Sequence, residues 1–126
     1  MEKQQFLYLV KVQNKHTGEV FVKLGYTGEI LRRRKELSAR NEHYEYSEYI
    51  LFRHDNKTKG YFYDEQTIHD VSMPYRARIN RYAMPDGYTE CYEYAYIYTL
   101  IECLHILGYR SVYDELPEPP QMFAWN

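Results

Sequence analysis

The stretch that decides the fold is FLYLVKVQNKHTGEVFVKLG, which covers residues 6–25. Residues 6–12 and 19–25 are rich in the β-branched and aromatic side chains that suit strands, and residues 14–18 supply the Asn and Gly of a turn. The stretch therefore predicts a β-hairpin. Because alternate side chains of a strand point the same way, one face of its first strand carries Phe6, Tyr8, Val10 and Val12.

Patterns further along the chain predict helices around one more strand. Residues 29–39 carry apolar residues among long polar ones, as a surface helix does, and residues 44–52 are rich in Tyr, Ile, Leu and Phe, as a strand is. Helices are expected at residues 61–70 and, from apolar residues at helical spacing, at 90–107. Residues 75–82 fit either a short strand or a loop. The expected fold is an α/β (α+β) domain with a three-stranded antiparallel sheet flanked by helices.

A length of 126 residues suits a single hydrophobic core. Residues 1–110 are expected to form the domain, and residues 111–126, which hold three prolines and only acidic charges, an extended tail or a docked arm. Cys91 and Cys103 fall within one expected helix, which favours small core residues in a reducing compartment over a disulfide.

Hydropathy and charge limit the classes of partner. No uncharged apolar run approaches the roughly 20 residues of a membrane span, and the N-terminus lacks the plan of a signal peptide, so we expect a cytoplasmic protein without membrane contact. A formal net charge of -2 argues against coating nucleic acid by bulk electrostatics. DNA contact would need a local patch, and the candidate DNA-binding residues are Arg32, Arg34, Lys35 and Arg40.

Tyrosine is the outlier of the composition, with 16 copies. Aromatic rings serve either as stacking platforms for nucleic-acid bases or as half-buried packing of strands with a polar handle. Composition alone favours packing.

Several residues in these expected elements are candidates for a functional site. In chain order they are Leu7-Tyr8, Lys23-Leu24-Gly25-Tyr26-Thr27, Arg33, Glu65, His69 and Thr89-Glu90. No single one is specific, but their order, over roughly residues 6–95, resembles the GIY-YIG nuclease superfamily. Thr89-Glu90 at the opening of the last expected helix resembles a further mark of the phage and bacterial branch.

Hydrolysis of a phosphodiester bond needs an activated water, neutralisation of charge on the phosphate and help for the leaving oxygen. Glu65 is the expected metal ligand, for Mg²⁺ or Mn²⁺, and Arg33 offers a planar fork of donors to a phosphate. Tyr8 resembles the superfamily's first-strand tyrosine, which orients or deprotonates the water. A nearby metal and Arg33 would lower the pKa of this phenol for that task.

Lys23 departs from the superfamily's pattern, because it stands where the first tyrosine of the second motif is usual. Tyr26 is expected to substitute, while Lys23 either binds a phosphate or lowers the pKa of Tyr8. His69 is either a phosphate ligand or a general acid/base. Glu90 lies near the place of the superfamily's late asparagine, but a carboxylate in the first turn of a helix is favoured by the helix dipole whatever its function.

The leading hypothesis is a metal-dependent DNA endonuclease. The alternative is a catalytically inactive domain of the same shape that serves as a binding module or inhibitor, for example one that engages a host defence protein through the tyrosine-rich and acidic surface. A nucleic-acid binder without cleavage is a third hypothesis.

Overall fold

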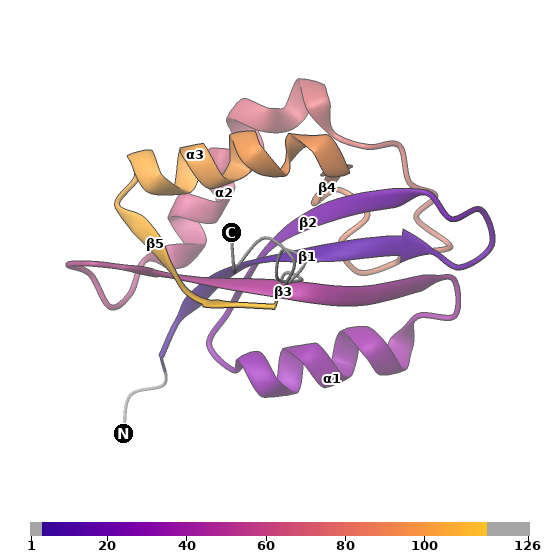
Figure 1. Ribbon diagram of the computed structural model, residues 1–126, viewed down its shortest axis with the longest axis horizontal. Helices are drawn as coiled ribbons and strands as arrows, with labels where there is room; N and C mark the ends of the chain where they lie inside the picture. The colour runs from indigo at the N-terminus through magenta and orange to yellow at the C-terminus, as the bar shows by residue number, and fades with distance from the viewer. Residues whose placement is uncertain (1–3, 116–126) are drawn as a thin grey trace, which may run out of the picture.

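Five antiparallel strands form one sheet in the order β4-β2-β1-β3-β5 in the computed structural model of the chain (Figure 1). The structure describes residues 4–115, apart from the side chains of residues 38–40. The strands are β1 (Phe6–Asn14), β2 (Val20–Thr27), β3 (Tyr44–His54), β4 (Cys91–Glu93) and β5 (Tyr109–Asp114). The expected hairpin is confirmed as β1 and β2, with Tyr8 opposite Gly25 in the register.

Helices cover both faces of this sheet. The α-helices are α1 (Ile30–Arg40), α2 (Tyr61–Ser72) and α3 (Ile97–Ile106), and the short 3-10 helices are η1 (Met73–Tyr75) and η2 (Tyr94–Tyr96). In Figure 1, α2 and α3 lie above the sheet and α1 lies below it. The chain between η1 and β4 contributes Met84 and other apolar residues to the same side as α1.

The alternation of side chains along β1 divides the core into two layers. Leu7 and Leu9 belong to the layer under α2 and α3. Tyr8, Val10 and Val12 belong to the layer on the α1 side, and Phe6 packs against it, so the expected shared face is confirmed. Tyr8 therefore lies on the face of the sheet opposite to α2. It nevertheless lines the same cleft as Glu65 of α2.

The expectation of a three-stranded sheet is wrong, because β4 and β5 extend the sheet at its two edges. Residues 90–107 do not form one helix either: Cys91–Glu93 pairs with Phe21–Lys23 of β2, and α3 begins only at Ile97. Backbone pairing with an open sheet edge outweighs the helical spacing of this segment. Cys91 and Cys103 consequently lie in different elements, and both are free thiols.

The ends of the expected domain also differ in detail. Of residues 75–82, Tyr75 ends η1, Arg76 makes an isolated bridge with Tyr92, and the others run as turns and loops. Residues 109–114 form strand β5 against β3, so the sheet continues into the segment expected to be a tail or arm. The rest of that segment, residues 116–126, lies outside the described residues. Within the described part of the chain, the helices are too short or too polar to span a membrane.

Candidate functional site

An open cleft of about 400 Å³ brings together side chains from β1, β2, α1, α2 and the loop before β4. Its lining residues are Tyr8, Lys23, Tyr26, Arg33, Phe62, Glu65, Pro85, Asp86, Gly87 and Glu90. The sequence-predicted residues Tyr8, Lys23, Tyr26, Arg33 and Glu65 therefore share one concave surface. Predicted residue His69 lies behind Glu65 on α2.

Tyr8 depends on a glycine in the opposite strand. A Cβ added to Gly25 would lie 2.2 Å from Cζ of Tyr8, so only glycine leaves room for this ring. Tyr8 is 1% exposed, and burial raises the pKa of its phenol well above the ordinary value, against the weaker opposite effect of Arg33. Arg33 acts to lower the pKa of Tyr8, as expected, but burial outweighs it, and the lowering expected from a metal ion stays a prediction. The phenol keeps its proton and is a hydrogen-bond donor.

Lys23 is a buried cation in the same cleft, with its Nζ atom 5.7 Å from the centroid of the Tyr8 ring. The loop before β4 packs on it at Gly87, where φ is +95° and an added Cβ would lie 2.8 Å from Cε of Lys23. The charge of Lys23 acts to lower the pKa of Glu65. Lys23 thus places a positive charge beside Tyr8 and Glu65 in the cleft.

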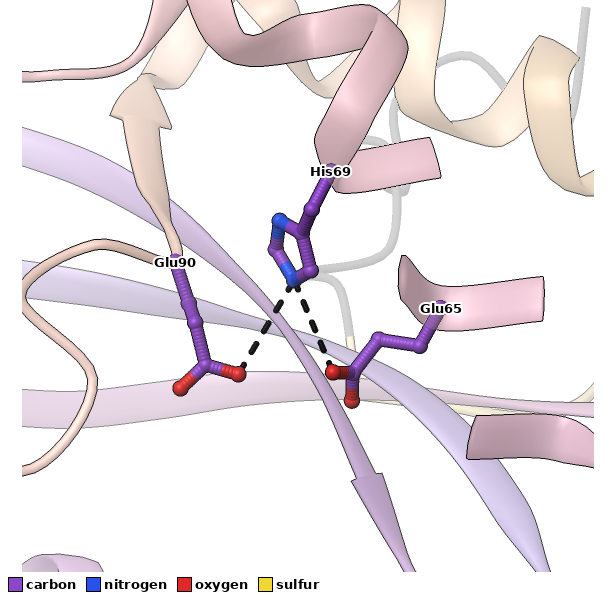
Figure 2. A group of neighbouring side chains, drawn as sticks. All are labelled: Glu65, His69 and Glu90. Carbon is purple, nitrogen blue, oxygen red and sulfur yellow. Dashed lines mark ion pairs between the residues drawn. The ribbon is translucent and has the colours of Figure 1, made fainter. Parts of the chain in front are cut away.

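Glu65, His69 and Glu90 converge at one end of the cleft, with one potential ligand atom from each all within 4.8 Å of one another (Figure 2). Glu65 is 3% exposed. Burial, followed by repulsion from Glu90, raises its pKa to about 7, although a hydrogen bond from Gln66 and the charges of Lys23 and Arg33 oppose the rise. A cation placed beside Glu65 and Glu90 would favour the ionised form of this carboxyl.

His69 is held by two hydrogen bonds that fix its protonation. Its Nε2 atom lies 3.0 Å from the carbonyl oxygen of Leu24, which can only accept, so Nε2 carries a proton. Its Nδ1 atom lies 2.6 Å from the hydroxyl of Tyr92, which donates to it. Burial lowers the pKa of the imidazole, so it is neutral at neutral pH. The ion pairs drawn to Glu65 and Glu90, at 3.9 and 3.8 Å, would require a charged ring.

The edge of β2 explains why these groups meet here. Strand β4 pairs only with Phe21–Lys23 and stops short of the next residue, Leu24. At Leu24 the backbone N–H donates to the carbonyl of Glu90 at 3.2 Å, and the carbonyl accepts from His69. One residue of the sheet edge therefore anchors both the loop that carries Glu90 and the helix that carries Glu65.

The prediction that Glu90 opens a helix is wrong. Glu90 follows a turn closed by its own N–H on the carbonyl of Gly87, and it precedes β4. The helix dipole therefore does not account for this carboxylate.

Of the basic residues of helix α1, only Arg33 is among the described residues that line the cleft. Arg33 lines the cleft, with Nη1 3.5 Å from Glu36. Arg32 pairs with both Glu29 and Glu36, at 2.9 Å each, and Arg34 pairs with Glu115 at 2.7 Å. Lys35 is exposed, and Arg40 belongs to α1 with its side chain outside the described part.

Comparison with known proteins assigns the family. A sequence model of the T5orf172 domain matches residues 5–106, the greater part of the chain. The chain belongs to the T5orf172 domain family. This domain occurs in phage and bacterial proteins. The match includes every residue of the cleft and ends with α3, before strand β5. No curated protein and no solved structure is significantly similar to the chain.

Proposed function

We propose that this T5orf172 domain is a metal-dependent DNA endonuclease of the GIY-YIG type, which hydrolyses phosphodiester bonds with Mg²⁺ or Mn²⁺. The observation that carries the proposal is the buried carboxylate of Glu65 in one cleft with Arg33, Lys23 and Tyr8. Burying an ionisable carboxylate costs stability, and perturbed groups in a cleft concentrate at functional sites. The association of this family with nucleases of the homing-endonuclease kind also supports it.

The donor set fits a hard divalent cation. Glu65 and Glu90 offer carboxylate oxygens, and magnesium keeps several of its waters, so one or two carboxylates suffice. The Nε2 proton of His69 is committed to Leu24, so the carboxylates are the ligands and His69 positions them. When bound, the cation supplies charge neutralisation at the scissile phosphate and assistance to the leaving oxygen.

The other side chains of the cleft provide binding and proton placement. Arg33 presents a guanidinium to the phosphate from α1, and Lys23 adds a second positive charge from β2. Tyr8 keeps its proton, so its role is to donate a hydrogen bond that orients water or phosphate instead of acting as a base. Tyr26 also lines the cleft, with its ring in an edge contact with Phe62 at a centroid distance of 6.0 Å.

The second candidate is a catalytically inactive binding module for a protein partner. Two observations favour it: Lys23 in the place of a tyrosine, and the pairing of Arg32 and Arg34 with carboxylates, which weakens the basic face of α1. The two candidates differ in whether the cleft performs chemistry.

A supercoiled-plasmid nicking assay separates them. Wild type is compared with Glu65→Gln and Arg33→Gln, with and without Mg²⁺ or Mn²⁺. Matched controls are Glu102→Gln on α3 and Arg110→Gln on β5, both exposed and outside the cleft. Loss of a group that stabilises the transition state lowers turnover by about 100-fold or more. If wild type nicks no faster than the two cleft variants while all remain folded, hydrolysis is wrong and the binding module takes precedence.

A further inference from the structure

The chain between α2 and β4 carries a second basic segment that is separate from helix α1. Residues 74–85 read PYRARINRYAMP, which contains Arg76, Arg78 and Arg81 and no acidic residue. The first carboxylate after them is Asp86, which lines the catalytic cleft. The segment thus leads directly into the loop that forms one wall of that cleft.

Two of these arginines are available to an anion. Arg76 and Arg78 are exposed, and among residues 4–115 neither forms an ion pair with a carboxylate. Arg32 and Arg34 of α1, in contrast, are each paired. Since a paired arginine must give up its carboxylate before it contacts a phosphate, the segment around Arg76 is the better anion-binding surface.

Four stacked rings connect this segment to α2. Tyr75 stacks on Tyr96 with centroids 5.2 Å apart, Tyr96 on Tyr92 at 5.1 Å, and Tyr92 on His69 at 5.8 Å. The interplanar angles are 21°, 29° and 13°, so the rings are close to parallel. The stack runs from the histidine behind Glu65 to Tyr75, which is 62% exposed. Tyr75 is therefore a fixed aromatic ring that packing against Tyr96 leaves largely open.

Arg76 and Arg78 line two open grooves, one on each side of the segment. The groove with Tyr75 and Tyr96 has a volume of about 710 Å³, and its lining also includes Glu19 and Glu93. The other groove, of about 610 Å³, is lined by Asn80, Tyr88 and Thr89 among others, and its described lining contains no carboxylate. A phosphate is thus favoured in the second groove, and an uncharged ring in the first.

We propose that residues 74–80 bind a single-stranded stretch of nucleic acid, with an unpaired base stacked on Tyr75 and the adjoining phosphates held by Arg76 and Arg78. Bases stack on aromatic side chains whatever their sequence, and arginines follow the backbone. Glu19 and Glu93 do not oppose a base, since carboxylates accept hydrogen bonds from exocyclic amino groups, as from cytosine N4. The inference rests on the proposed nucleic-acid substrate and specifies it as one with an unpaired region.

Fluorescence anisotropy of a labelled single-stranded oligonucleotide, in EDTA so that no cleavage occurs, tests the inference. Tyr75→Ala is expected to weaken binding about tenfold, while Tyr75→Trp retains it. Tyr98→Ala is the matched control, because Tyr98 is also an exposed tyrosine, at 77%, and lies outside both grooves. On a duplex of the same sequence, Tyr75→Ala should change the affinity by less than twofold, because a paired base is not free to stack.

The arginines are tested through salt dependence. Arg76→Gln/Arg78→Gln is expected to reduce the slope of log K against log salt by about 1.4, since each single-strand phosphate contact contributes about 0.7. Arg32→Gln/Arg34→Gln, the matched pair on α1, should change it by less than half as much. Equal effects of the two pairs, or of Tyr75→Ala and Tyr98→Ala, would overturn the inference.

The outcome also separates this inference from the proposed function. A wild-type protein that binds the oligonucleotide through Tyr75 and Arg76 but never cleaves with Mg²⁺ or Mn²⁺ retains the inference and loses the nuclease. A protein that nicks plasmid while all single-strand variants bind alike retains the nuclease and loses the inference. Absence of any nucleic-acid binding by wild type contradicts both.

Discussion

The Nε2 atom of His69 donates its proton to the carbonyl oxygen of Leu24 at a distance of 3.0 Å, and this hydrogen bond removes the imidazole from the set of metal ligands. The neighbouring carboxylates of Glu65 and Glu90 remain. The same hydrogen bond joins α2 to the edge of β2, so His69 fixes the position of the helix that carries Glu65.

The first prediction concerns the division of labour between His69 and Glu65. Glu65→Gln should abolish measurable Mn²⁺ binding, whereas His69→Ala should retain it, because Glu65 is a proposed ligand and His69 is not. His69→Ala should also destabilise the fold by about 1–3 kcal/mol, since Leu24 and Tyr92 lose their partner. Calorimetric titration with Mn²⁺ and thermal unfolding in EDTA give the two readings. Equal loss of Mn²⁺ affinity in both variants would make His69 a ligand.

The second prediction is that the proposed metal ligand costs stability. The folded-state pKa of Glu65, about 7, lies above its ordinary value of 4.5. The free energy of unfolding is therefore highest below pH 4.5, where Glu65 is protonated, and falls as the pH rises through 7 and the buried carboxyl ionises. In EDTA, Glu65→Gln should therefore be more stable than wild type at pH 8, by up to about 3 kcal/mol, and the advantage should vanish near pH 4. Mn²⁺ at pH 8 should stabilise wild type alone. Denaturant unfolding at both pH values checks this, and equal stabilities at pH 8 would contradict it.

The third prediction concerns the contact between Gly25 and Tyr8. Gly25→Ala should destabilise the fold by about 1–3 kcal/mol, because the added Cβ overlaps the Tyr8 ring and the ring must move. In a Tyr8→Ala background the same change should cost less, since the overlap is gone. A double-mutant cycle from urea unfolding measures the difference. Additive effects of the two substitutions would show that the ring does not occupy this space. Gly28→Ala, where an added Cβ meets no atom within 4 Å, is the matched control.

The fourth prediction concerns a pH-dependent interaction of Asp64, which does not line the cleft. Tyr109 donates a hydrogen bond to Asp64 at 2.6 Å, and Lys57 pairs with the same carboxylate. Burial raises the pKa of Asp64, but the bonds from Lys57 and Tyr109 outweigh it, and the net pKa lies below 3.8. The stabilisation is thus complete above pH 3.8 and is lost as the pH falls through the lower, folded-state value.

Tyr109→Phe should accordingly lower the unfolding free energy by about 1–3 kcal/mol at pH 7, and by less at pH 2–3. Thermal unfolding across this range is the measurement. A Tyr98→Phe variant serves as the control, because Tyr98 is an exposed tyrosine on α3. A pH-independent loss in Tyr109→Phe would show that the hydrogen bond to Asp64 is not its source.

The central hairpin and β3 could be predicted from the sequence, because local alternation encodes them. The cleft residues were predicted by another route, the resemblance of their order along the chain to that of a known superfamily. Strand β4 could not, since Cys91–Glu93 is only three residues long and its pairing partner lies far away in β2. Strand β5 lacked a signal for another reason: only Tyr109 in it is buried, so no alternation marks it. Both strands are defined by the open edges that they cover.

The ion pairs and pKa shifts of the site could not be predicted from the sequence either, because they depend on contacts between residues far apart in the chain. The pairing of Arg34 with Glu115 joins α1 to the residue after β5, and charge counting along the helix misses it. The raised pKa of Tyr8 follows from its burial, which depends on Gly25 and the packing of α1 and the loop around Met84. The basic segment at residues 74–85 was visible in the sequence, but its stacking on Tyr96 was not.

The early end of β4 has a further consequence for whether this sheet edge can pair with another chain. An uncovered stretch of sheet edge is a template on which a foreign strand can add and begin aggregation. Here the backbone of Leu24 is already engaged by Glu90 and His69. The contacts that cover this stretch of sheet edge are therefore the same contacts that hold Glu90 and His69 in place.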